Sequence, residues 1–68
     1  MANWYINGFE KTRPKAHSLY DNLHNEYPEQ PFELWEIEPD RYGNRYVVIT
    51  RKKQRGPTPK IKLLHKIR

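Results

Sequence analysis

A chain of 68 residues without cysteine is long enough for one small domain, and it has neither disulfides nor thiolate metal ligands to stabilise it. Its thirteen Lys and Arg outnumber its eight Asp and Glu, which favours an acidic partner. The first residues lack a basic stretch followed by an apolar one, and no apolar run approaches the roughly 20 residues that a membrane span requires. We therefore expect a soluble, cytoplasmic protein that does not enter a membrane.

The first predicted strand is followed by one helix. Residues 3–9 (NWYINGF) are aromatic and β-branched, which is typical of a strand. Thr12 and Pro14 mark a helix start, because proline needs no amide partner in the first turn. An apolar stripe at helical spacing follows, formed by Ala16, Leu19, Tyr20, Leu23 and Tyr27. The helix should end before Pro28, because a residue that precedes proline is pushed out of the helical region.

A hairpin is predicted from residues 32–38 and 45–52. The linker DRYGN suits a type I turn followed by a bulge, with Asp40 in its first position and Gly43 in the left-handed position. We expect Asp40 to face Asn44 across this turn.

This register would place Trp35 opposite Ile49 and Glu33 opposite Arg51. Because side chains alternate along a strand, one face of the hairpin then carries Trp35, Ile37, Val47 and Ile49. The other face carries Phe32, Leu34, Tyr46 and Val48. We expect the helix to cover the first face and the second face to stay open for a partner.

The C-terminal quarter of the chain begins as a loop. Residues 53–59 (KQRGPTP) are polar and rich in Gly and Pro, whereas residues 60–68 (KIKLLHKIR) nearly alternate and favour a fourth strand. Helical spacing also fits this tail, so a helix remains open. The chain is therefore expected to be one α+β domain over residues 1–68, with a β-α-β-β core over 1–52 and a right-handed crossover through the helix. One helix would pack on one face of a three- or four-stranded sheet.

Charge is distributed unequally along the chain. Residues 1–40 carry a formal charge of −5, while residues 41–68 carry +10 and contain no Asp or Glu. Lys and Arg displace counterions from nucleic-acid phosphates, so the basic half predicts a nucleic-acid-binding protein. The predicted phosphate contacts are Arg45, Arg51, Lys52, Lys53, Arg55, Lys60 and Lys62, and Tyr46 is expected to stack on unpaired bases. The lysines would otherwise form the solvated face of the last strand and protect its edge from aggregation.

A protein-interaction module is the alternative. The open face of Phe32, Leu34, Tyr46 and Val48 would then bind a protein or a second copy of the chain, so the protein would be a monomer or a homodimer. Its size and polarity would suit a phage or mobile-element inhibitor of a host or defence complex that processes nucleic acid.

Catalysis and metal binding find little support in the sequence. His17, Asp21 and His24 share one flank of the predicted helix, but no fourth ligand accompanies them. No nucleophile or glycine-rich phosphate loop is recognisable. We expect a protein without enzymatic activity, metal or cofactor.

Overall fold

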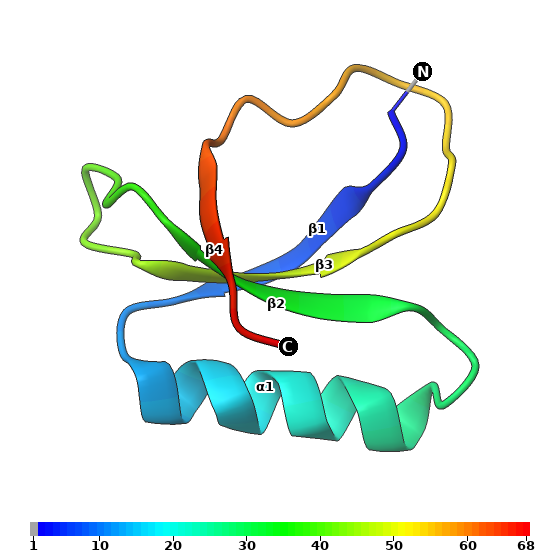
Figure 1. Ribbon diagram of the computed structural model, residues 1–68, viewed down its shortest axis with the longest axis horizontal. Helices are drawn as coiled ribbons and strands as arrows, with labels where there is room; N and C mark the ends of the chain where they lie inside the picture. The colour runs from blue at the N-terminus through cyan, green and yellow to red at the C-terminus, as the bar shows by residue number, and fades with distance from the viewer. Residues whose placement is uncertain (1) are drawn as a thin grey trace.

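One helix lies against a four-stranded sheet in the computed structural model of the protein, which describes residues 2–68 (Figure 1). The elements are β1 (Tyr5–Glu10), α1 (Arg13–Glu26), β2 (Phe32–Ile37), β3 (Tyr46–Thr50) and β4 (Leu63–Lys66). The strand order is β1-β3-β2-β4, and every neighbouring pair is antiparallel. The predicted α+β fold is confirmed, and the C-terminal tail forms the fourth strand. No helix among the described residues is both long and apolar enough to cross a membrane.

A proline lies near each end of helix α1. Thr12 is the N-cap residue, and Pro14 lies in the first turn. At the other end the backbone N–H of Tyr27 donates to the carbonyl oxygen of Leu23 at 2.8 Å, directly before Pro28. This bond satisfies a carbonyl that the last turn would otherwise leave without a partner.

The helix packs on the sheet face opposite to the one predicted. Ala16 of α1 is buried against Phe32, Leu34 and Val48, and Tyr46 packs against this cluster in a half-buried position. The face that was expected to be open is therefore covered by the helix. Both hairpin faces are apolar, so the alternation of side chains separated the two faces without showing which one the helix covers.

Small residues let the helix pack on this face of the sheet. Gly8 of β1 pairs with Val48, and a Cβ atom at Gly8 would lie 3.1 Å from Cδ2 of Leu19. A glycine in the strand and Ala16 in the helix thus let the two backbones approach closely on this side.

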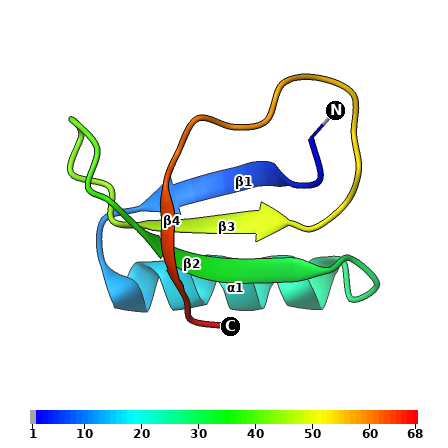
Figure 2. The ribbon, with the colours of Figure 1, turned by 45° about the horizontal axis from the view of Figure 1, so that its top comes forward.

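The second face is covered by the C-terminal segment. Ile37, Val47 and Ile49 are buried there, and Ile61 and Leu63 pack against them. The half-buried aromatic side chains of Trp4, Phe9 and Trp35 complete this cluster, which we call the aromatic cluster. The segment that leads into β4 crosses in front of the other strands in Figure 2, on the side away from α1. Both faces of the sheet are therefore covered.

The predicted turn is confirmed, but the predicted strand register is wrong by two residues. Asp40 N–H donates to the carbonyl oxygen of Asn44 at 3.2 Å, and Gly43 has a φ of 82°. Trp35, however, pairs with Val47. The shift arises because Glu38 and Pro39 lie between Ile37 and the turn without partners on the opposite strand. Pro39 has no amide hydrogen to continue the ladder. A shift of two leaves every side chain on its predicted face.

The tail passes from one face of the sheet to the other around the edge at β2. Leu63 pairs with Ile37 and contacts the aromatic cluster, whereas Ile67 packs with the residues under the helix. Ile67 N–H donates to the carbonyl oxygen of Leu34 at 2.7 Å. The last residue, Arg68, then contacts Asp21 of α1 at 3.3 Å.

Candidate nucleic-acid interface

Five of the predicted phosphate contacts lie on one exposed segment. Residues 52–62 leave the end of β3, pass beside the start of β1 and return to the start of β4 (Figures 1 and 2). The five cationic residues of this segment are all exposed: Lys52, Lys53, Arg55, Lys60 and Lys62. We call the segment 52–62 the basic arc. It contains no Asp or Glu.

The backbone of the arc is held to the domain at several points. Arg51 N–H donates to the carbonyl oxygen of Pro31 at 2.9 Å, and Gln54 N–H donates to that of Ala2 at 3.1 Å. Gly56, with a φ of 118°, makes a bend that other residues rarely adopt. Ile61 then anchors the far end in the aromatic cluster. The arc is therefore held to the domain at Gln54 and Ile61, and its cations lie in solvent.

The arc spans the length of the sheet. It starts at the end of β3, and it ends where Leu63 pairs with Ile37, beside the start of β3. The five residues of β3 cover roughly 17 Å at about 3.3 Å per residue. One strand of duplex DNA presents a phosphate about every 3.4 Å along the axis. The two ends of the arc are therefore separated by a distance that spans about five phosphates of one DNA strand, and the exposed Arg45 lies near its hairpin end.

Arg51 is engaged within the domain. Its Nη2 lies 2.8 Å from Oε1 of Glu33, and its Nε donates to Oε2 at 3.2 Å. Trp35 Nε1 also donates to Oε1 of Glu33, at 2.9 Å. These contacts, above all the hydrogen bond from Arg51, lower the pKa of Glu33 below its ordinary value. Glu33 and Arg51, which were expected to face each other, form an ion pair, although Glu33 faces Ile49 in the actual register.

Tyr46 is placed differently from the expectation. It pairs with Glu10 on one side and Glu36 on the other, and its side chain packs against the cluster under α1. The prediction that Tyr46 stacks bases on an open sheet face is wrong, because the helix covers that face.

The histidines of the helix contact their own neighbours. Arg13 Nε donates to His17 Nε2 at 3.3 Å, and the ring of His24 is stacked on that of Tyr20 with a centroid distance of 6.0 Å. Within residues 2–68, no group of three His, Cys, Asp or Glu is placed to hold a metal ion.

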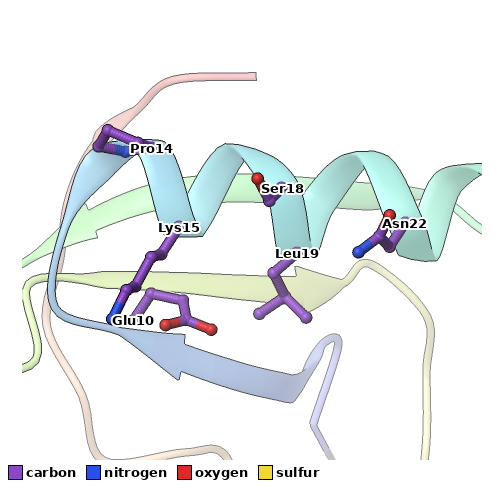
Figure 3. A pocket seen from close by; sticks show the side chains of 6 residues that line it. All are labelled: Glu10, Pro14, Lys15, Ser18, Leu19 and Asn22. Atoms are coloured by element: carbon purple, nitrogen blue, oxygen red, sulfur yellow. The ribbon is translucent and has the colours of Figure 1, made fainter.

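Several surface hollows flank the helix, and two of them reach the sheet. The larger, of about 380 Å³, lies between α1 and the outer edge of β1, and Figure 3 shows Lys15 extending from the helix toward Glu10 on the strand. It is open and lined mainly by polar side chains: Glu10, Pro14, Lys15, Ser18, Leu19 and Asn22. Opposite charges at its mouth fit neither an anion nor an apolar ligand well.

The second hollow, of about 350 Å³, lies at the other end of the helix. Three aromatic and two amide side chains line it together with one leucine: Tyr5, Tyr27, Phe32, Asn7, Gln30 and Leu23. We call this the aromatic pocket. No pattern in the sequence predicts this pocket, because its residues come from β1, α1, the α1–β2 link and β2.

Three of the eight acidic residues lie on α1 or just after it. Glu26 and Glu29 are exposed at the C-terminal end of α1, and Asp21 pairs with Arg68. Figure 1 shows the arc on the opposite side of the sheet from α1. These three carboxylates are therefore separated in space from the basic arc. Comparison with protein-family models, curated proteins and solved structures found no match to this chain.

Proposed function

We propose that the protein is a non-enzymatic nucleic-acid-binding protein and that its basic arc contacts the phosphate backbone. The observation that carries this proposal is the set of five exposed cations on one anchored segment without a carboxylate. Among the ion pairs between residues 2–68, each involves Arg51, Lys66 or Arg68, and none involves a member of the arc. Five cations that the fold does not neutralise can neutralise an external polyanion.

The anchoring of the arc supports this role. Lys and Arg bind phosphates largely through counterion release, which depends on how many charges face the backbone at once. A segment held at Gln54 and Ile61 presents its cations without ordering a long disordered loop on binding.

Protection of a strand edge explains the arc less well. Lys66 lies within β4, at the edge of the sheet, where a lysine discourages pairing with other chains. The arc precedes β4, and its members are not part of a strand edge. The alternative in which a protein binds the face of Phe32, Leu34, Tyr46 and Val48 has lost its basis, because the helix occupies that face.

Charge reversal of three arc residues tests the proposal. The triple variant Lys52→Glu, Lys53→Glu and Arg55→Glu should abolish binding to DNA, measured by fluorescence anisotropy, while the circular dichroism spectrum stays unchanged. For the wild type, the logarithm of the association constant should fall with the logarithm of salt concentration with a slope of about −4 to −5 on duplex DNA.

A matched control separates the arc from net charge. Reversing Lys11, Arg13 and Lys15 changes the formal charge by the same amount, and these three exposed residues lie at the N-terminal end of α1. This control should retain most of the binding. A salt slope near zero, or equal losses in the two triple variants, would contradict the proposal.

A further inference from the structure

We infer that the aromatic pocket receives one unpaired base of a single-stranded nucleic acid whose phosphates lie on the basic arc. This inference rests on the proposed function and names the form of nucleic acid and the position of its base. In the strand register, Tyr5 and Phe32 are the two cross-strand neighbours of Thr50. Two aromatic side chains thus flank one buried position at the end of the sheet.

The pocket has the chemistry of a base-binding site. Tyr27, which is 50% exposed, contributes a third aromatic ring that a base can contact. Aromatic rings bind bases of any sequence because every base has a π face. Asn7 and Gln30 add amide groups, which can donate to and accept from the polar edge of a base.

Asn7 is fixed in place by the fold. It is the extra residue of the β1 bulge, between the paired Ile6 and Gly8. Its Nδ2 donates to Oγ1 of the fully buried Thr50 at 2.7 Å. This bond leaves Oδ1 and a second N–H of the amide for a ligand. The bulge therefore positions a hydrogen-bonding group beside aromatic rings, as recognition of a base requires.

The arc begins beside this pocket. Lys52 follows Thr50 by two residues, and its N–H donates to the Thr50 carbonyl oxygen at 3.0 Å. The other rim is acidic, because the adjoining hollow shares Tyr27 and Gln30 with the pocket and is also lined by Glu26 and Glu29. Phosphates are repelled from that rim and attracted to the Lys52 side. A strand with its base in the pocket is thereby directed onto the arc.

An abasic strand provides the test. A single-stranded DNA oligonucleotide should bind about five- to tenfold more tightly than an abasic strand of the same length, with the same salt slope; this is the lower part of the range for base–aromatic stacking. Tyr27→Ala should reduce the affinity for the ordinary strand to that for the abasic strand and leave the latter unchanged. Tyr27→Phe should retain the wild-type affinity, because it keeps the ring.

Tyr42→Ala is the matched control, since this tyrosine is 62% exposed and lies in the hairpin turn at the opposite end of the sheet. It should bind both strands like the wild type. Equal affinities for the ordinary and abasic strands, with the salt slope retained, would overturn the base pocket and leave the phosphate contacts standing. Salt-independent binding of both strands, or the absence of binding, would overturn the proposed function itself.

Discussion

Glu33 is the side chain on which most of the ion pairing across the sheet depends. It accepts hydrogen bonds from Arg51 and Trp35, and Lys66 Nζ lies 4.0 Å from its Oε2. Its side chain is only 16% exposed, so solvent screens these contacts less than it screens the pair of Arg68 and Asp21. The cluster joins β2 to the residue after β3 and to β4, and it keeps Arg51 within the domain. Arg51 is therefore left out of the proposed phosphate contacts.

The lowered pKa of Glu33 predicts a loss of stability in acid. Because the folded state holds this pKa below its ordinary value of 4.5, ionised Glu33 stabilises the fold, and its contribution is complete above that value. The contribution is lost as the pH falls through the lowered pKa. In urea titrations between neutral and acidic pH, Glu33→Gln should show a smaller drop in unfolding free energy than the wild type.

Asp40 contributes in the same direction. The side chain of Asn44, followed by backbone N–H groups of the turn, lowers its pKa. Asp40→Asn should also reduce the drop in unfolding free energy between neutral and acidic pH. The double variant with Glu33→Gln should show the smallest drop. A Glu33→Gln profile parallel to that of the wild type would show that the cluster does not stabilise the folded state.

Among the elements, the contact between α1 and β1 determines which sheet face the helix covers. Gly8 has no positive φ, so its importance lies in the space beside Leu19 rather than in its backbone conformation. Gly8→Ala should destabilise the wild type by about 1 kcal/mol, near the lower limit for an overpacked core. In a Leu19→Ala background, the same change should instead stabilise by up to about 1 kcal/mol, because alanine restricts the unfolded chain.

A double-mutant cycle from chemical denaturation measures this coupling. Additive effects of the two substitutions would show that Leu19 does not approach Gly8, and hence that the helix lies elsewhere. Gly43→Ala is an unsuitable comparison, because the φ of 82° at Gly43 would add backbone strain.

The elements themselves could be predicted from local patterns, whereas their mutual placement could not. Helical spacing, proline positions and the DRYGN turn act between neighbouring residues, and they gave the element order and the division of side chains between faces. The position of the helix depends on Gly8 meeting Leu19, a contact that no periodicity encodes. The two-residue slip depends on Glu38 and Pro39 remaining outside the ladder.

The candidate site divides in the same way. The arc was predictable because its charges are consecutive in the chain and lack acidic neighbours. The separation of Arg51 from the other cations depends on a cross-strand contact with Glu33, and the aromatic pocket brings Tyr5, Tyr27 and Phe32 together from separate elements. Properties that arise from tertiary contacts appear only in the folded structure.

For the whole molecule, the C-terminal segment contributes to the stability of the fold and carries the cations of the proposed function. It carries the basic arc, and its apolar residues then close the two halves of the core: Ile61 and Leu63 cover the aromatic cluster, while Ile67 packs under the helix. A domain of this size buries only about 60% of the surface of its unfolded chain, so its core is small. Ligand binding to the arc should therefore also stabilise the fold, since the arc is anchored through Ile61.

Truncation after Arg55 tests this dependence. Loss of residues 56–68 removes β4 and uncovers Ile37, Val47, Ile49 and the tryptophans beside them. Tryptophan emission should therefore shift to longer wavelength, and cooperative thermal unfolding should disappear. Lys62→Ala is the control within the same segment: its side chain is exposed, so the melting temperature should stay close to that of the wild type. A truncated chain that still melted cooperatively with unchanged emission would show that β1, α1, β2 and β3 form a complete core. The tail would then serve only to carry the last cations of the arc.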